Sequence, residues 1–146
     1  MIYTIGFTQT TAQQFFERLI KNKIDLLLDI RLNNKSQLAG FAKYPDIAWF
    51  SERIVNAKYK HDIKFAPDES ILKPYKKNEI SWKEYERRFH ALMEKRKIDS
   101  YIESNYLPLR ETNICLLCSE PTPEQCHRRL VADYFNQIFK TDIVHI

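Results

Sequence analysis

The chain has 146 residues, of which 44% are hydrophobic and 29% are charged, and its formal net charge is +4. This length suits one domain with its own hydrophobic core, and this composition excludes a disordered or fibrous protein. Only two glycines are present, Gly6 and Gly40, which excludes the dinucleotide-binding fingerprint and the phosphate-binding P-loop.

The sequence also leads to an expected location. No apolar run approaches the roughly 20 residues that span a bilayer, and the first ten residues lack the basic and apolar segments of a secretory signal. We therefore expect a cytoplasmic protein with no membrane contact. Its three cysteines should stay reduced and not form a disulfide framework.

Two apolar strands separated by a helix are predicted first. Residues 2–6 (IYTIG) and 24–31 (IDLLLDIR) are short, apolar and rich in branched side chains, as buried strands are. Residues 11–21 repeat apolar side chains at helical spacing. The inward face of this helix would carry Phe15, Phe16, Leu19 and Ile20. Continuous apolar strands separated by a helix favour a parallel sheet covered on both faces.

The middle of the chain mixes helices with one half-exposed strand. Asp46 is the candidate cap of a helix over about 47–57, whose inward side chains would be Ile47, Phe50 and Ile54. Residues 59–65 alternate in polarity, which predicts a strand with Ile63 on the apolar side and Asp62 on the polar side.

A longer helix follows. Ser81 and Glu84 have the spacing of a capping box. The helix that they open would bury Trp82, Tyr85, Phe89, Leu92 and Met93. A further short helix is predicted over residues 99–106.

The last part of the chain contains two more predicted strands, 113–118 (NICLLC) and 142–146 (DIVHI). Between them, Thr122 is the predicted cap of a helix, with Pro123 in the first position and Gln125 completing the box. The alternation of strands and helices predicts a single α/β domain over residues 1–146, with about five mostly parallel strands and helices on both faces.

Polar side chains follow the ends of these strands. In parallel sheets, ligands bind beyond the carboxyl ends of the strands, and this rule brings several residues to one edge: Thr4, Gly6, Asp29, Arg31, Cys118 and Glu120. Strand alternation places Asp29 and Arg31 on one side of the sheet, and likewise Cys118 and Glu120. Cys115 has the opposite parity and is expected to be an inert core thiol.

The predicted helix after Cys118 adds further candidates. Cys126 and His127 fall on its apolar face and should point inward. Arg128 lies at the border of that face, where it would either pair with Glu124 or bind an anion at the helix start. Arg129 would pair with Asp133 on the outer face. His145 ends the last strand and could reach the site, whereas no motif surrounds His61 or His90.

Several segments together resemble a known bacterial and archaeal group, domain-of-unknown-function family 488. They are TIGF at 4–7, DIR at 29–31 with Ser36 after it, FAPDESIL at 65–72, LCSEPTPEQCHR at 117–128 and HI at 145–146. The resemblance implies a Rossmann-like α/β domain with these residues clustered at one site, and it supplies no function. Many relatives have a proline soon after the Asp-x-Arg element, whereas this chain has LNNKSQLAGF, which indicates a subgroup.

The first functional hypothesis is an enzyme that acts on a phosphate-bearing ligand such as a nucleotide or nucleic acid. Cys118 or Cys126 would be the nucleophile, His127 the base, and Glu120 or Asp29 the assisting carboxylate. Anion-binding candidates are Thr4, Gly6, Arg31, Ser36, Arg128 and His145. Ordinary cysteine-phosphatase chemistry is not expected, because Glu120 would repel a phosphate dianion and prolines at 121 and 123 lack amide donors.

Three alternatives use other chemistry. Cys118, Cys126 and His127, with or without His145, could bind zinc, but the spacing is unusual for a zinc clip, so we expect no metal and no cofactor. Cys118 and Cys126 could instead form a reversible redox pair. A non-catalytic nucleic-acid-binding module would use the interleaved cations and aromatic residues of one loop, namely Lys35, Phe41, Lys43, Tyr44 and Trp49.

A purely structural explanation also exists. In it, Asp29 and Arg31 form an ion pair, Thr122 and Gln125 cap a helix, and the cysteines fill space.

Overall fold

A computed structural model describes residues 1–35 and 39–146 of the chain, and within these ranges five strands form one sheet. The strands are β1 (Ile2–Gly6), β2 (Leu26–Asp29), β3 (Lys58–His61), β4 (Ile114–Cys118) and β5 (Ile143–His145). Their order is β3-β2-β4-β1-β5, and every neighbouring pair is parallel. The predicted α/β class is therefore confirmed, with a sheet that is parallel throughout.

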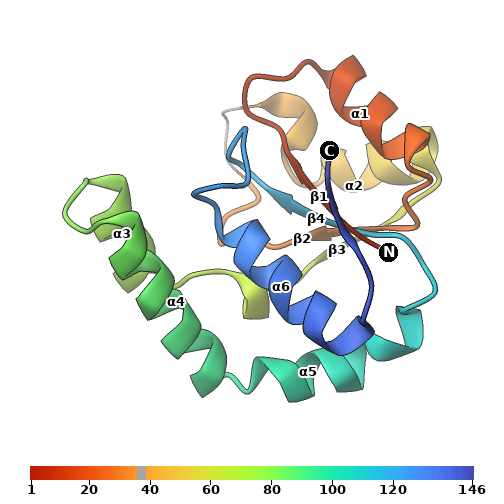
Figure 1. Ribbon diagram of the computed structural model, residues 1–146. Coiled ribbons are helices and arrows are strands. Elements are labelled where there is room, and N and C mark those ends of the chain that lie inside the picture. Colours follow the sequence, from red (N-terminus) through yellow and green to blue (C-terminus); the bar gives the residue numbers. More distant parts are fainter. Residues whose placement is uncertain (36–38) are drawn as a thin grey trace.

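Helices cover both faces of this sheet (Figure 1). On one face lie α1 (Ala12–Lys21), α2 (Asp46–Phe50) and the π-helical continuation of α2, η2 (Ser51–Val55). On the other face lie α5 (Ile98–Asn105) and α6 (His127–Phe139). The arrangement is Rossmann-like, as expected.

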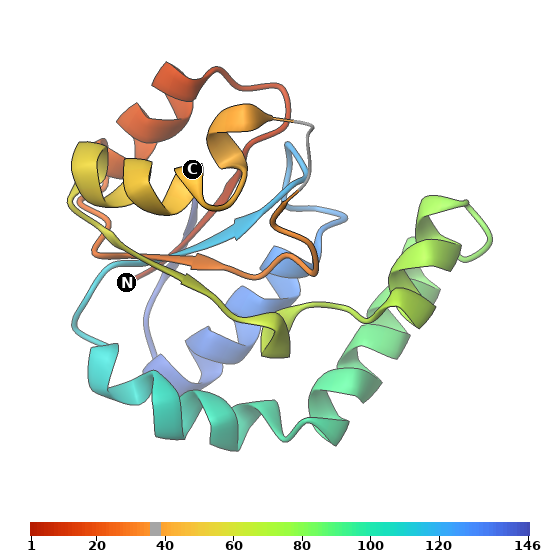
Figure 2. The same cartoon turned by 180° about the vertical axis from the view of Figure 1, so that it is seen from behind.

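Two further helices, α3 (Glu69–Lys76) and α4 (Trp82–Lys95), form an arm that projects beside the sheet (Figures 1 and 2). Arg96, just after α4, anchors the arm because its Nη1 donates to the backbone carbonyl groups of Ile63, Lys64 and Ala66. Tyr85 and Phe89 of α4 belong to the core cluster that lies under α6. The arm is thus fixed to the body at its base.

The core has two parts, one on each face of the sheet. Along β4, Leu116 packs toward α6 while Cys115 and Leu117 pack toward α1. Cys115 is fully buried, so it is a core side chain, as predicted, and burial raises the pKa of its thiol. Both faces of β4 are apolar because helices cover both, which explains the unbroken run ICLLC.

The predicted strand over residues 59–65 is partly wrong. β3 ends at His61, and the next residues form a short 3₁₀-helix, η3 (Ile63–Phe65). Asp62 is buried and accepts hydrogen bonds from the hydroxyl groups of Tyr101 and Tyr106, whereas Ile63 is 56% exposed. These hydrogen bonds stabilise the buried carboxylate and reverse the predicted polarity of the two positions.

The first predicted helices are confirmed with changes in detail. Thr11 caps α1 through a capping box with Gln14, but Ile20 faces outward and is exposed. Asp46 lies inside α2, whose N-cap is Pro45, so its predicted capping role is wrong. Ile54 is also exposed, because the π-helical turn of η2 rotates it away from the core.

The predicted start of the last helix is wrong. α6 begins at His127, with Cys126 as an extended N-cap residue, and residues 121–126 form bends and a turn. Among the described residues, no side chain caps α6. The side chain of Thr122 instead lies near Glu124, where it lowers the pKa of that carboxylate. Pro123 and Gln125 therefore lie in a loop, which runs from the end of β4 to α6.

Two smaller predictions need correction. Ser81 does cap α4 by accepting from the amide of Glu84, but the Glu84 carboxylate pairs with Arg87 and Arg88 and does not complete the box. Arg129 pairs with Glu86 of α4 and not with Asp133. This ion pair exists because the arm packs beside α6, a contact that helix periodicity alone does not show. No helix in the described ranges is both long and apolar enough to cross a membrane.

Candidate functional site

The candidate residues meet at a cavity of about 620 Å³ beyond the carboxyl ends of the strands. The loop that joins β4 to α6 forms one wall, and the arm forms the opposite wall. Five of the predicted site residues line it: Arg31, Cys118, Glu120, Cys126 and His127. The strand-end rule predicted that these residues meet at one edge of the sheet, and the structure brings these five together there. Their role as a functional site stays a prediction.

Cys118 and His127 are in contact at the base of the cavity. Cys118 Sγ lies 3.5 Å from His127 Nδ1, and His127 Nε2 lies 2.8 Å from the carbonyl oxygen of Ile30. A carbonyl oxygen only accepts hydrogen bonds, so Nε2 carries a proton. Nδ1 of the neutral ring therefore presents its lone pair to the cysteine sulfur, where it can accept the thiol proton.

The two cysteines of the loop have opposite acidities. Hydrogen bonds from the Cys126 thiol and from the Ser119 and Glu120 backbone, together with the charge of Arg128, lower the pKa of Cys118 despite its burial. The same hydrogen bond to Cys118 and burial raise the pKa of Cys126. Cys118 is thus the cysteine that ionises first, and Cys126 is the thiol that stabilises its thiolate.

Close packing against β1 holds the loop in place. The Thr8 hydroxyl donates to the carbonyl oxygen of Ser119 at 2.6 Å, and Arg128 Nη1 donates to the carbonyl oxygen of Glu120. Gly6 permits this approach, because a Cβ atom at that position would lie 1.8 Å from the Glu120 carbonyl oxygen. Arg128 and Gly6, both predicted as anion-binding residues, therefore lie behind the loop and support it.

Asp29 and Arg31 form a buried bidentate ion pair. Arg31 Nε and Nη2 donate to the two carboxylate oxygens at 2.8 and 2.6 Å, and Nη2 also donates to the carbonyl oxygen of Ala42. The Tyr59 hydroxyl donates to the same carboxylate, and burial raises the pKa of this tyrosine. Asp29 is fully buried, so it positions Arg31, which lines the cavity.

The remaining predicted residues lie elsewhere. Thr4 Oγ1 and His145 Nδ1 are 2.7 Å apart on the neighbouring strands β1 and β5, and neither is among the cavity-lining residues described. Burial and the charge of Arg128 lower the pKa of His145. Ser36 lies outside the described residues. His61, for which no role was predicted, contacts the carbonyl oxygen of Arg31.

Sequence reasoning missed the residues that the arm contributes. Tyr75, Lys76 and Tyr85 line the cavity together with Pro67 and Leu72. The rings of Tyr75 and Tyr85 are 4.8 Å apart, and the Tyr75 hydroxyl reaches Gln125 Oε1 in the loop at 3.4 Å. Pro67 and Leu72 belong to the FAPDESIL segment, so the family resemblance was the one available signal for this wall.

Three possible metal ligands are also close together. The ligand atoms of Cys118, Cys126 and His127 all lie within 4.8 Å of one another. The adjacent residues 126 and 127 can both offer a ligand atom to this cluster. Cys126 precedes the helix in an extended conformation, and His127 begins it, so both side chains point to the same place.

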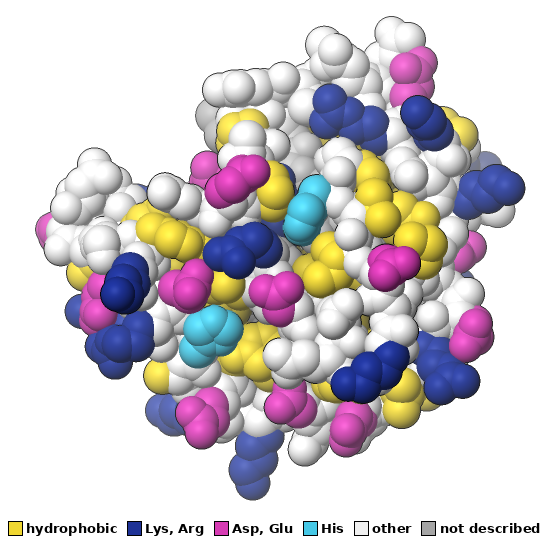
Figure 3. All heavy atoms as spheres, in the orientation of Figure 1, with side chains coloured by type: hydrophobic (Ala, Val, Ile, Leu, Met, Phe, Trp, Pro, Cys, Tyr) yellow, Lys and Arg dark blue, Asp and Glu magenta, His cyan; other side chains and the backbone are white. Residues whose placement is uncertain are grey.

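The loop proposed for nucleic-acid binding is partly used in packing, although Tyr44 is 41% exposed. Phe41 packs on Phe15 and Phe16, and Tyr44 stacks on Tyr59. Trp49 is 58% exposed. On the face that Figure 3 shows, Lys and Arg side chains alternate with Asp and Glu side chains and form no continuous basic surface.

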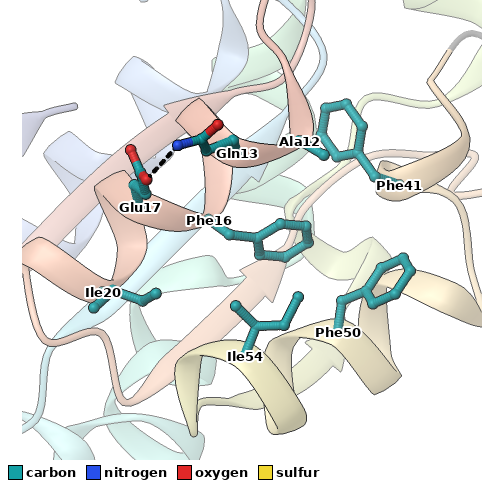
Figure 4. A pocket seen from close by; sticks show the side chains of 8 residues that line it. All are labelled: Ala12, Gln13, Phe16, Glu17, Ile20, Phe41, Phe50 and Ile54. Atoms are coloured by element: carbon teal, nitrogen blue, oxygen red, sulfur yellow. Dashed lines mark hydrogen bonds between the residues drawn. The ribbon is translucent and has the colours of Figure 1, made fainter.

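A second cavity, of about 380 Å³, lies between α1 and the α2–η2 segment (Figure 4). Its walls are mostly apolar, with side chains such as Phe16, Phe50 and Ile54, and its polar residues Gln13 and Glu17 hydrogen-bond each other. It contains no cysteine or histidine among its lining residues, in contrast to the first cavity.

The comparison with protein families matches the model described as "Domain of unknown function DUF488" to residues 11–135. This range contains β2, β4, the loop and the arm, whereas the TIGF and HI segments lie outside it. No curated protein and no solved structure is significantly similar to the chain.

Proposed function

We propose that this chain, which belongs to the family of domains of unknown function DUF488, is a cysteine-dependent enzyme that acts on a phosphate-bearing ligand such as a nucleotide. The observation that carries this proposal is the Cys118–His127 contact in a cavity. A thiol 3.5 Å from an oriented imidazole nitrogen is the arrangement that nucleophilic catalysis requires.

The reaction would begin when the proton moves from Cys118 Sγ to His127 Nδ1. The sulfur then forms a bond to an electrophilic atom of the ligand, and the leaving group departs with the proton from His127 Nδ1. A water molecule that gives its proton to His127 Nδ1 would then attack the same atom and break its bond to sulfur, which releases the product and restores Cys118. Ile30 assists because its carbonyl oxygen holds the ring by Nε2 throughout. Arg128 and Cys126 stabilise the thiolate.

The walls of the cavity suit a nucleotide. Arg31 and Lys76 supply positive charge, and Thr8 and Asn33 supply polar groups. The tyrosine pair of the arm, Tyr75 and Tyr85, offers aromatic surface on which a base can stack. A non-catalytic nucleic-acid-binding module is less well supported, because Phe41 and Tyr44 are used in packing.

The phosphate would anchor the ligand and would not be the group attacked. The backbone of Ser119 and Glu120 helps to lower the pKa of Cys118, and the prolines at 121 and 123 have no amide hydrogen. The loop thus lacks the donors that a cysteine phosphatase directs at its phosphate. The attacked atom is therefore expected to lie elsewhere in the ligand than at its phosphorus.

Alkylation of reduced, chelator-treated protein tests the state of Cys118. We expect iodoacetamide to label Cys118 first, because its thiolate fraction is the largest of the three cysteines. The labelling rate should rise with pH to a midpoint below 9.0, the ordinary thiol value, and Cys126→Ala should raise that midpoint. Peptide mass spectrometry at several pH values measures both effects.

The matched control is Cys115→Ala, which removes a thiol on the opposite face of the sheet. Its labelling profile should equal that of the original protein. Preferential labelling of Cys126, or a Cys118 midpoint at or above 9.0, would contradict the assigned nucleophile.

Ligand protection and turnover test the substrate class. Adenosine monophosphate should slow the alkylation of Cys118, while adenosine should have little effect, because it lacks the phosphate that Arg31 and Lys76 would bind. In a screen of nucleotides for product formation by chromatography, His127→Ala should reduce any turnover by about 100-fold or more. Equal protection by both probes, or turnover that survives in Cys118→Ala, would refute the proposal.

A further inference from the structure

The geometry points to a zinc site formed by Cys118, Cys126 and His127, in which Zn²⁺ binds the two sulfur atoms and His127 Nδ1. The three ligand atoms come from the end of β4 and the start of α6, and all lie within 4.8 Å of one another. Two thiolates and one imidazole are the ligand types that zinc prefers.

One of the three separations between ligand atoms matches a tetrahedral ion, and the other two are at most 4.8 Å. With Zn–S about 2.3 Å and Zn–N about 2.05 Å at the tetrahedral angle, the sulfur and nitrogen atoms should be about 3.6 Å apart. Cys118 Sγ and His127 Nδ1 are 3.5 Å apart. An ion would thus need almost no change in the separation of these two ligands.

Outer hydrogen bonds of the kind found around metal sites are already present. His127 Nε2 donates to the carbonyl oxygen of Ile30 at 2.8 Å, which is the usual way of orienting a metal-binding imidazole. Arg128 Nη1 lies 3.7 Å from Cys126 Sγ and donates to it. Each of these residues fixes a ligand that would otherwise rotate.

The ion would keep one open position. All three ligands line the cavity of about 620 Å³, so a water molecule or a ligand atom can complete the tetrahedron from that side. Three protein ligands with a free position are typical of zinc sites that exchange their fourth ligand, whereas closed structural sites use four. This distinguishes the site from the zinc clip considered for the sequence.

Zinc would also regulate the proposed enzyme, and this consequence rests on the proposed function. Both thiols bind as thiolates and release their protons to solvent. The electron pair of Cys118 that would attack a ligand is then shared with Zn²⁺, so the zinc-bound protein should be inactive as a nucleophile. Removal of zinc would activate Cys118.

The test uses the full-length, reduced protein after chelator treatment. Zn²⁺ is titrated against a chromophoric competing chelator, and Co²⁺ is added to a separate sample for absorption spectroscopy. We expect one ion per chain, together with the intense bands of tetrahedral Co²⁺ and a sulfur-to-cobalt charge-transfer band. Cys126→Ser and His127→Gln should each weaken zinc affinity by about 100-fold or more.

Cys115→Ala and His145→Gln are the controls, because these residues offer similar ligands away from the cluster. Both should bind zinc like the original protein. The site would be overturned if Cys126→Ser bound zinc as tightly as the original protein, or if Cys115→Ala weakened zinc affinity as much as Cys126→Ser does. An octahedral Co²⁺ spectrum without a charge-transfer band would overturn it as well. Circular dichroism confirms that each variant is folded.

The two proposals can fail separately. If Zn²⁺ does not bind but adenosine monophosphate still protects Cys118 from alkylation, the zinc site is refuted and the enzyme proposal stands. If Zn²⁺ binds and blocks alkylation but no nucleotide does, the zinc site stands without the proposed substrate. Alkylation of Cys118 at an unchanged rate in saturating Zn²⁺ refutes the regulatory role.

Discussion

Replacing Gly6 with alanine is expected to destabilise the protein by about 3 kcal/mol or more. The added Cβ atom would lie 1.8 Å from the carbonyl oxygen of Glu120 and 2.9 Å from Arg128 Nη1. Because the first of these atoms belongs to the backbone, the loop after β4 must move to relieve the contact. Equilibrium unfolding in urea measures the loss of free energy.

The same change should also damage the site. The loop that would move begins directly after Cys118, and the backbone of its residues Ser119 and Glu120 helps to lower the pKa of Cys118. We therefore expect the pH midpoint of Cys118 alkylation to rise in Gly6→Ala under conditions where the variant remains folded. Loss of this backbone contribution makes the thiolate less stable.

Gly40 is the matched control because a Cβ atom there meets nothing within 4 Å. Gly40→Ala should be neutral or should stabilise the protein by up to about 1 kcal/mol through the unfolded state. If Gly6→Ala is as stable as Gly40→Ala, the loop does not pack against Gly6 as closely as the structure shows.

Gly6 illustrates what the sequence could and could not predict. The strand IYTIG and its position at the sheet edge follow from local pattern. The role expected for the glycine was anion binding, whereas its observed role is to admit the carbonyl oxygen of Glu120. That contact joins residues that are about 114 positions apart in the chain, so rules that use only local sequence cannot predict it.

The site as a whole also combines features that local sequence pattern predicts with long-range contacts that it does not. Arg31, Cys118 and His127 could be gathered in advance, because parallel strands end at one edge and helix periodicity turns His127 inward. The wall formed by Tyr75 and Tyr85 could not, since nothing in an amphipathic helix identifies the surface on which it packs. Asp62 was misplaced for a similar reason, because its partners, Tyr101 and Tyr106, are distant in sequence.

Asp29→Ala is expected to cost about 3–5 kcal/mol of stability, since it leaves the Arg31 guanidinium buried without its partner. Arg31 is only 4% exposed, and its Nε and Nη2 donate hydrogen bonds to this carboxylate. The Tyr59 hydroxyl would lose its acceptor as well. Urea unfolding measures the loss, and Glu69→Ala, which breaks the exposed Lys73–Glu69 pair, should change stability by only about 0.5 kcal/mol or less.

A second substitution separates the structural role of Asp29 from a catalytic one. Arg31→Met in the Asp29→Ala background removes the unpaired charge and should restore part of the lost stability. If Asp29 only positions Arg31, the alkylation profile of Cys118 should be nearly unchanged in folded Asp29→Ala, while protection by adenosine monophosphate weakens as Arg31 is displaced. A shifted Cys118 midpoint with intact nucleotide protection would instead assign the carboxylate to the Cys118–His127 pair, and Asp29 would then be part of the catalytic group.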